Sequence, residues 1–191
     1  MNKTKTRRDR SVESSKPVKL DWLSRSPEET RAYGERIGKL LDGGEWIALD
    51  GPLGAGKTQF VQGLARGLGI TDNPITSPTF VFVHEFRGRR PFAHADLFRI
   101  ERAEDILDLG LLEYLDSPWV VAIEWADKGG RFLPAERLKI RLTHRGETSR
   151  RIKVEAVGNR YKKIVAEAQQ TAPLQKKTGR PRPPARANKQ R

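Results

Sequence analysis

The fold is decided by residues 46–58, which read Trp-Ile-Ala-Leu-Asp-Gly-Pro-Leu-Gly-Ala-Gly-Lys-Thr. Residues 46–49 form a short apolar run, typical of a strand that is buried on both faces of a parallel sheet. Residues 51–58 match the pattern G-x-x-x-x-G-K-[ST] at every fixed position. Apolar side chains then recur with helical spacing from Phe60 to Leu68, and Gly69 stands where a helix C-cap belongs. The stretch therefore predicts a strand, a glycine-rich turn and a helix, in that order.

The glycine-rich turn has the composition of a phosphate-binding loop. Its three glycines let the backbone turn tightly and bring N–H groups close to a phosphate chain. Lys57 offers a positive charge to the β- and γ-phosphates, and Thr58 offers a hydroxyl to Mg²⁺. The positive end of the helix dipole points at the same anion. We expect the following residues to bind a nucleotide: Leu53, Gly54, Ala55, Gly56, Lys57, Thr58 and Gln59.

The positive charge of the chain is concentrated at its two ends. The 191 residues carry a formal net charge of +13, to which residues 1–19 contribute +5 and residues 159–191 contribute +9, leaving −1 for the rest. Segments of this composition cannot bury enough apolar surface to fold. We expect a disordered basic extension at residues 1–19, one domain at residues 20–170, and a disordered tail rich in Pro, Lys and Arg at residues 171–191.

The cysteine content and the apolar runs bear on the compartment. The chain has no cysteine, which excludes disulfides and thiolate metal sites and fits a reducing environment. No apolar segment follows the basic N-terminus, and no stretch is long and apolar enough to span a bilayer. We therefore expect a cytoplasmic protein with no membrane contact.

The rest of the sequence alternates between helical and strand patterns. Ser26 can cap a helix whose first position is Pro27. Helical periodicity also appears at residues 104–115, broken near Gly110, and at residues 161–168. Apolar and alternating patterns predict strands, the first two forming a hairpin, at residues 79–86, 91–96, 119–123, 137–143 and 150–157. This order predicts an α/β fold: a three-layer, P-loop NTPase-like sandwich around a mixed sheet with a parallel centre and antiparallel margins.

Two carboxylates, Asp96 and Glu124, stand at the ends of predicted strands. In α/β sheets, ligands bind beyond the carboxyl ends of the parallel strands. Either carboxylate could hold Mg²⁺ opposite Thr58, directly or through water, and one could orient or deprotonate an attacking water. Alone, each would be read as an ordinary surface acid. Beside a phosphate loop we interpret both as catalytic, together with Lys57.

These residues also carry a family resemblance. The sequence resembles the TsaE family, also called the YjeE family, of bacterial ATPases required for the threonylcarbamoyladenosine modification of transfer RNA. The matching pieces are the loop Gly51 to Thr58, then Ser77-Pro78-Thr79-Phe80, His94-Ala95-Asp96-Leu97-Phe98-Arg99 and Glu124-Trp125. Their order and spacing fit as well, so the resemblance covers about residues 24–158. Only the first piece is shared by phosphate-loop proteins in general, whereas the combination is specific.

The resemblance implies a role for each matching residue. Thr58 and Glu124 would bind Mg²⁺, and Asp96 would support the hydrolysis of ATP. The segment Ser77-Pro78-Thr79 would be a mobile switch near the γ-phosphate, and Trp125 would lie close to the nucleotide or to a partner surface. The resemblance also names the partners as TsaD and TsaB, which together perform the carbamoyl transfer.

Two positions depart from the family pattern. Pro52 stands where an acidic residue is common, and Phe98 stands where Tyr is usual. Pro52 precedes the N–H groups that would hold the phosphates, so the loop keeps its donors. Phe98 lacks the hydroxyl through which a Tyr could form a hydrogen bond.

Histidines and basic segments offer weaker candidates. His84 and His94 alternate with apolar neighbours in predicted strands, and we interpret them as structural because no second metal-ligand cluster accompanies them. Arg87, Arg89 and Arg90 would form a charged, solvated hairpin tip. The basic C-terminal tail is either simply solvated or in contact with RNA phosphates. We hypothesise that it helps to recruit transfer RNA.

Several function classes share a phosphate loop. The leading interpretation is a Mg²⁺-dependent ATPase, weak alone and coupled to partner proteins. The alternative is a small-molecule kinase, which would also need an acceptor hydroxyl and a lid over both substrates. A regulatory GTPase ranks last because no N-K-x-D motif appears. A nucleic-acid-binding module without turnover does not explain why the nearly neutral core contains the loop.

Overall fold

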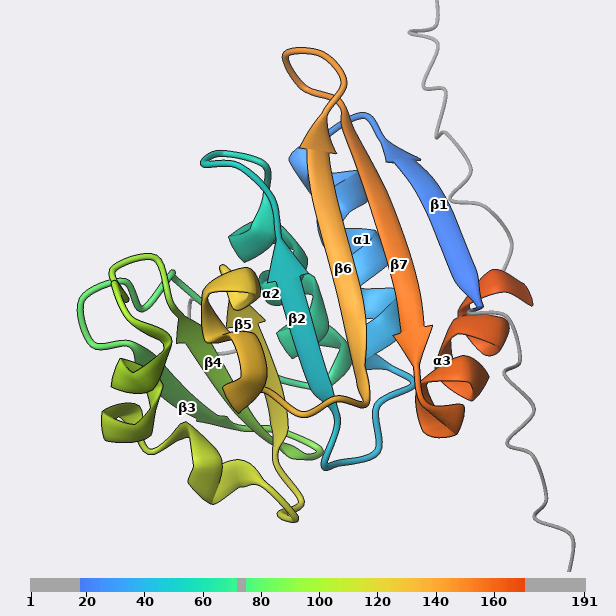
Figure 1. Ribbon diagram of the computed structural model, residues 1–191. Coiled ribbons are helices and arrows are strands. Elements are labelled where there is room, and N and C mark those ends of the chain that lie inside the picture. The colour runs from blue at the N-terminus through green and yellow to red at the C-terminus, as the bar shows by residue number, and fades with distance from the viewer. Residues whose placement is uncertain (1–17, 72–74, 171–191) are drawn as a thin grey trace, which may run out of the picture.

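A twisted seven-stranded sheet runs through the molecule in the order β1-β7-β6-β2-β5-β4-β3 (Figure 1). The computed structural model describes residues 18–71 and 75–170, so the two segments predicted to be disordered lie almost wholly outside the described residues. The strands are β1 (Lys19–Ser24), β2 (Trp46–Asp50), β3 (Val83–Arg87), β4 (Pro91–Asp96), β5 (Val120–Glu124), β6 (Arg137–His144) and β7 (Arg150–Val157).

The strand directions confirm the predicted α/β fold. Strands β6, β2, β5 and β4 run parallel at the centre, whereas β7 and β1 on one side and β3 on the other are antiparallel to their neighbours. Strand β2 lies between β5 and β6, at the middle of the sheet. Because parallel strands end at the same edge, the loop after β2 and the last residues of β4 and β5 come together there.

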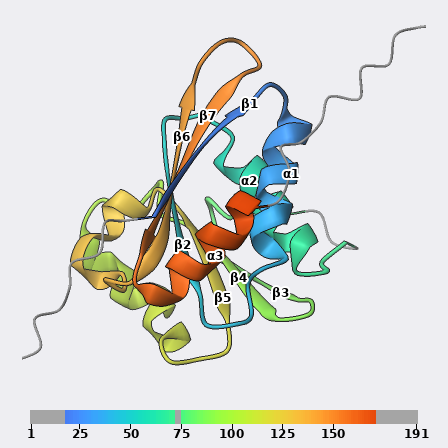
Figure 2. The same cartoon turned by 90° about the vertical axis from the view of Figure 1, so that its right-hand side faces the viewer.

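Helices cover both faces of the sheet (Figures 1 and 2). One face carries the α-helices α1 (Pro27–Gly38), α2 (Lys57–Gly67) and α3 (Asn159–Gln170), and the other carries the 3-10 helices η1 (Ala103–Leu109), η2 (Leu111–Tyr114) and η3 (Ala126–Phe132). Side chains alternate along β2, so Ile47 and Leu49 join the core under the α-helices while Trp46 and Ala48 join the core under the 3-10 helices. Within the described ranges, no helix is long and apolar enough to cross a membrane.

The predicted start of α1 is confirmed. The Ser26 hydroxyl accepts a hydrogen bond from the Glu29 N–H at 3.1 Å, and the Glu29 carboxylate accepts one from the Arg25 N–H at 2.7 Å. Pro27 occupies the first turn, where its missing N–H costs nothing.

The strand predicted at residues 79–86 begins only at Val83. The Pro78 carbonyl accepts hydrogen bonds from the N–H groups of Val81 and Phe82, at 3.1 and 2.7 Å, and Phe82 has a left-handed φ of 63°. A turn closed in this way cannot also pair as a strand. The family-like Ser-Pro-Thr-Phe segment is therefore a loop on the approach to the sheet.

Two further elements differ from the sequence-based expectation. The periodic segment 104–115 forms η1 and η2 rather than an α-helix, broken at Gly110 as predicted, where φ is 66°. Strand β1 was not predicted, although Leu20 and Trp22 alternate with charged residues. It forms by antiparallel pairing with β7, a partner more than 120 residues away in the sequence.

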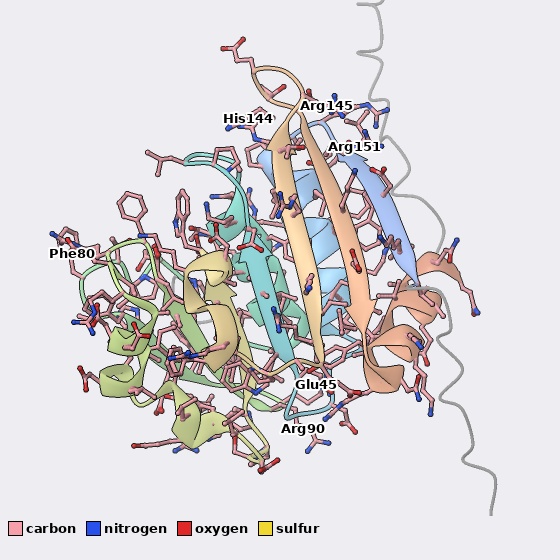
Figure 3. All side chains as sticks on the ribbon, viewed as in Figure 1. Glu45, Phe80, Arg90, His144, Arg145 and Arg151 are labelled. Carbon is pink, nitrogen blue, oxygen red and sulfur yellow. The ribbon has the colours of Figure 1, made fainter. Side chains whose placement is uncertain are left out.

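The prediction of a charged, solvated hairpin tip is confirmed in part: Arg87 and Arg89 are exposed, but Arg89 and Arg90 also bind the segment that ends α1. Arg89 donates to three carbonyls at the end of α1, the closest being that of Leu41 at 2.8 Å, and Arg90 pairs with Asp42 at 2.5 Å. Helix ends leave carbonyls without partners, and cations are favoured there. Glu45 and Arg90 mark this end of the sheet, and His144 marks the opposite end (Figure 3).

Candidate nucleotide-binding site

The glycine loop joins β2 to α2 by a backbone path that needs glycine. Gly51, Gly54 and Gly56 all have positive φ, of 146°, 72° and 97°. A Cβ on Gly51 would lie only 2.3 Å from the Leu142 carbonyl oxygen of β6, so this position excludes every side chain. Helix α2 begins at Lys57, and among the described residues no side chain caps that end. Its first N–H groups therefore remain available to an anion.

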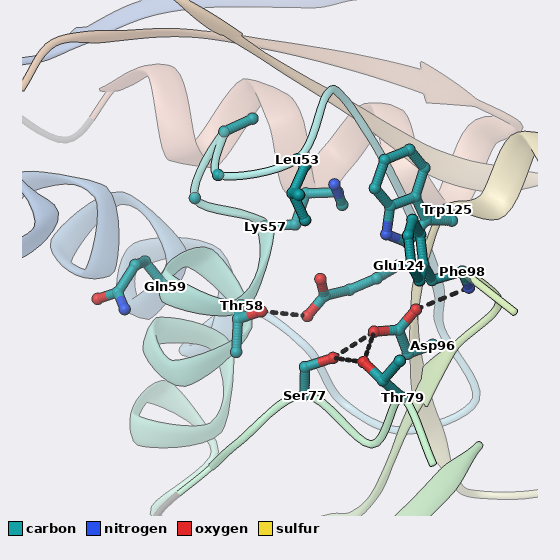
Figure 4. Close-up of a pocket in the computed structure, with 13 residues that line it drawn as sticks. Leu53, Lys57, Thr58, Gln59, Ser77, Thr79, Asp96, Phe98, Glu124 and Trp125 are labelled. Atoms are coloured by element: carbon teal, nitrogen blue, oxygen red, sulfur yellow. Dashed lines mark hydrogen bonds between the residues drawn. The ribbon is translucent and has the colours of Figure 1, made fainter. Parts of the chain in front are cut away.

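A pocket of about 500 Å³ opens in front of this helix end (Figure 4). It is lined by Leu53, Gly54, Ala55, Gly56, Lys57, Thr58, Gln59, Ser77, Thr79, Asp96, Phe98, Glu124 and Trp125. Every residue that the sequence suggested for the site is among them except Pro78, whose carbonyl closes the turn described above. The structure thus gathers the loop, both strand-end carboxylates and most of the switch segment around one space, while their roles remain predictions.

The two carboxylates are neighbours because β4 and β5 pair in parallel. The register sets Asp96 opposite Glu124, and both residues are nearly buried, at 2% and 3% exposure. The Thr58 hydroxyl donates to Oε1 of Glu124 at 2.8 Å. Helix α2 and strand β5 therefore present a hydroxyl and a carboxylate oxygen at the same spot in the pocket.

Asp96 faces the switch segment rather than the loop. Its Oδ2 accepts hydrogen bonds from the hydroxyls of Ser77 and Thr79, the latter at 2.9 Å, and its Oδ1 accepts one from the Phe98 N–H at 2.8 Å. The two hydroxyls also lie 2.8 Å apart. Two of these three donors, the hydroxyls of Ser77 and Thr79, belong to the switch segment, so the carboxylate holds that segment against the wall of the pocket (Figure 4).

Lys57 is folded back onto its own loop. Its Nζ donates to the carbonyls of Gly51 and Pro52, at 2.7 and 3.1 Å, and lies 3.7 Å from the centre of the Trp125 ring. Burial lowers the pKa of Lys57, while the carboxylates of Glu124 and Asp96 act in the opposite direction. The ammonium is thus held in the pocket by carbonyl dipoles, an aromatic face and two nearby anions.

Trp125 and Phe98 form an aromatic wall. Trp125 follows β5 with a left-handed φ of 57°, which turns its ring back over the pocket. The two rings lie 5.1 Å apart between centres. Phe98 cannot replace the hydrogen bond of a Tyr, but packing against Trp125 gives its ring a place in the site.

Two residues near the site were missed or read differently from the sequence. His94 was interpreted as a structural histidine, yet its Nε2 lies 3.0 Å from Oε1 of Glu124. Arg150 was not singled out, and its guanidinium donates to the Gly54 carbonyl at 3.4 Å. The strand register could have pointed to His94, since it stands two residues before Asp96 on the same face of β4. No sequence pattern predicts the role of Arg150, because its contact with Gly54 depends on where the β6–β7 hairpin lies relative to the glycine loop.

The chain has a P-loop NTPase fold, because the glycine loop follows a central parallel strand and the Thr58 hydroxyl and Glu124 carboxylate lie beside it. A crystal structure of Bacillus subtilis YdiB superimposes with a TM-score of 0.71 and 36% identity, over 82% of this chain and 97% of that chain. The family model described as "Threonylcarbamoyl adenosine biosynthesis protein TsaE" matches residues 24–152, and the chain belongs to this TsaE family.

Two curated relatives agree with the family model. The Bacillus subtilis (strain 168) protein named tRNA threonylcarbamoyladenosine biosynthesis protein TsaE is 41% identical over 149 residues, which is 78% of this chain and 92% of the relative. The protein of the same name from Treponema pallidum is 39% identical over 132 residues, which is 69% of this chain and 97% of the relative. The family model runs from the last residue of β1 into β7, whereas the two basic ends lie beyond it.

Proposed function

We propose that this chain binds ATP with Mg²⁺, hydrolyses it, and through that cycle acts on partner proteins in the formation of threonylcarbamoyladenosine on transfer RNA. The observation that carries the proposal is the contact between the Thr58 hydroxyl and the Glu124 carboxylate, 2.8 Å apart. It lies beside the start of α2, which no side chain of the described residues caps. The pathway comes from the relatives, both named as tRNA threonylcarbamoyladenosine biosynthesis proteins.

The loop and α2 would hold the phosphates. Backbone N–H groups of the loop and the positive end of α2 favour an anion at this position. Lys57 would exchange the carbonyls of Gly51 and Pro52 for phosphate oxygens, which are stronger partners because they are charged. Since Lys57 is only 5% exposed, its charge is weakly screened by water and acts strongly on a bound phosphate.

The residues present fit a magnesium ion that arrives with a nucleotide. Thr58 and Glu124 offer two oxygen ligands, and Mg²⁺ commonly takes one or two protein ligands and completes its shell with phosphates and water. Among the described residues there is no group of three or more His, Asp or Glu side chains that could hold a metal ion alone. When bound, Mg²⁺ would neutralise charge on the phosphate oxygens during transfer.

Asp96 would support hydrolysis through the switch segment. The hydroxyls of Ser77 and Thr79 occupy its Oδ2, so in this state the carboxylate serves to hold residues 77–79 at the pocket. To orient or deprotonate a water, Asp96 would exchange one of these hydroxyl bonds for a bond to that water. The availability of Asp96 would then follow the position of the segment, which is how a partner could control turnover.

The partners proposed are TsaD and TsaB, and transfer RNA through the basic tail. The tail lies outside the described residues, so support for RNA contact comes from its charge alone. Deleting residues 171–191 should weaken RNA affinity at low salt while ATP binding stays unchanged. An unchanged RNA affinity would contradict this part of the proposal.

The direct test is phosphate release from ATP and Mg²⁺, measured for the protein alone and with TsaD and TsaB. Lys57→Ala should abolish release, whereas Lys139→Ala, which removes an exposed charge from the middle of β6, should leave it unchanged. Nucleotide consumed only when an acceptor hydroxyl is supplied would instead indicate a small-molecule kinase. No ATP binding under any of these conditions would refute the proposal.

A further inference from the structure

His94 is a buried polar residue that the proposed chemistry leaves without a role. It lies on β4, two residues before Asp96, and its side chain is fully buried. Its Nε2 lies 3.0 Å from Oε1 of Glu124, and its Nδ1 has no hydrogen-bond partner among the described residues. Leaving a buried ring nitrogen unpaired is unfavourable, so an apolar residue would serve packing better at this position.

The strand register explains how the ring reaches Glu124. His94 stands opposite Ala122 of β5, and Asp96 stands opposite Glu124. Glu124 is therefore the diagonal neighbour of His94 across the strand pair, within reach of an aromatic side chain. Ala122 has no side-chain atom beyond Cβ, so the imidazole can lie over it and extend toward Glu124.

The two contacts on Glu124 converge on one oxygen. Oε1 accepts the Thr58 hydroxyl at 2.8 Å and lies 3.0 Å from Nε2 of His94. A carboxylate only accepts, so the ring must carry a proton on Nε2 to form the second bond. Nδ1 has no acceptor among the described residues, so the neutral Nε2–H tautomer is the form that leaves no buried N–H unpaired. With Oε1 held from helix α2 on one side and strand β4 on the other, the rotation of the carboxylate is fixed and Oε2 is left for other partners.

We propose that His94, as its Nε2–H tautomer, is a positioning residue that fixes the Glu124 carboxylate for magnesium. This inference rests on the proposed function, because it assigns His94 a task only if Glu124 meets the ion. It predicts that His94 matters for the gain in nucleotide affinity that Mg²⁺ provides and matters little for nucleotide binding without the ion.

Three substitutions separate positioning from packing. His94→Gln places an amide N–H where Nε2 lies, His94→Asn places one where Nδ1 lies, and His94→Leu removes both. Titration calorimetry with ATP, in Mg²⁺ and in EDTA, gives the affinity gain for each protein. We expect the gain to fall about 10-fold to 100-fold in the Asn and Leu variants and to stay within about threefold of wild type in the Gln variant.

Stability and NMR spectra keep the test decisive. Thermal unfolding identifies any variant that fails to fold. If His94→Leu fails to fold, the comparison of His94→Gln with His94→Asn still tests the positioning role. The chain has only three histidines, so ¹⁵N spectra of the nucleotide-free protein can assign the tautomer of His94, for which we expect a protonated Nε2. A protonated Nδ1 with a bare Nε2 would overturn the inference.

The outcomes distinguish this inference from the function on which it rests. A wild-type protein whose ATP affinity does not respond to Mg²⁺ would refute the proposed function and the inference with it. If all three variants retain the wild-type gain in ATP affinity with Mg²⁺, or if the Gln and Asn variants lose it equally, the positioning role of His94 is refuted while the proposed function stands. Retention by Gln with loss by Asn supports it.

Discussion

Replacing Gly63 by alanine should destabilise the protein, against the preference of an isolated helix. Gly63 lies in the middle of α2, where alanine would normally be favoured by about 1 kcal/mol. In this fold α2 packs directly on α1, and a Cβ on Gly63 would lie 2.0 Å from the Arg31 carbonyl oxygen and 2.8 Å from the Glu35 nitrogen. Both atoms belong to the backbone of α1, so no side-chain rotation can relieve the contact.

The size of the effect follows from that overlap. Real Cβ contacts are essentially never shorter than 3.0 Å, so the helices would have to separate by roughly 1 Å at this point. The separation would loosen the fully buried Phe60 and Leu64 beside it. Overpacking typically costs about 1–3 kcal/mol. Because the overlap is with backbone atoms that cannot move aside, we expect a cost at the upper end of this range, above the helix-propensity gain of about 1 kcal/mol. For a domain of this size the melting temperature should fall by about 2–4 °C per kcal/mol.

Urea unfolding followed by circular dichroism measures the change in free energy. Arg66→Ala is the matched control, because Arg66 is exposed on the same helix. Its effect should stay within about 0.5 kcal/mol. A Gly63→Ala protein as stable as wild type, or more stable, would refute the conclusion that close contact between the helix backbones requires glycine here.

Three further predictions concern the site and the sheet ends. Thr58→Val removes a hydroxyl with little change of shape, so calorimetry should show the Mg²⁺-dependent part of ATP affinity reduced about tenfold or more, on the order of 1.4 kcal/mol, and the Mg²⁺-free affinity unchanged. Burial raises the pKa of Asp50 above its ordinary value of 3.8, so the folded protein favours the protonated side chain. The stability that protonated Asp50 contributes at lower pH is lost as the pH rises through the raised pKa and the carboxyl ionises. Asp50→Asn should therefore be more stabilising, relative to wild type, at about pH 7 than at about pH 4, and urea unfolding showing the opposite order would contradict this. Arg89→Ala should cost about 1 kcal/mol, because the carbonyls that end α1 lose their cation, whereas Arg87→Ala, exposed on the same hairpin, should cost less than about 0.5 kcal/mol by the same measurement.

The parts of the site that are local in sequence could be predicted from it. The loop from Gly51 to Thr58 carries its own geometry in its glycine spacing, and the apolar run before it marks a central strand. The positions of Asp96 and Glu124 followed from one rule, that parallel strands end at the same edge. A motif together with a topology rule was enough to locate the pocket.

The hydrogen-bond partners of these residues could not be predicted, because they depend on register and on loop shape. Asp96 holds Ser77 and Thr79 only because the Pro78 turn brings residues 77–79 back toward β4. His94 reaches its diagonal neighbour Glu124 across the strand pair because the residue directly opposite His94 is the small Ala122. Such contacts join segments 17 to 30 residues apart, and no pattern in the sequence fixes their distance.

The charges in the pocket give an electrostatic reason why nucleotide binding should depend on magnesium. Lys57 is the cation that Glu124 and Asp96 stabilise, and it lies with them in a nearly buried space. A phosphate chain would draw the Lys57 ammonium toward itself, so the positive charge that balances the two carboxylates would move away from them. The phosphates would also add negative charge beside the carboxylates. At short range and low dielectric, repulsion between such groups costs several kcal/mol unless another cation enters. A divalent ion held by Thr58 and Glu124 would supply that cation, so ATP and Mg²⁺ should bind as a coupled pair, each strengthening the other by the same factor.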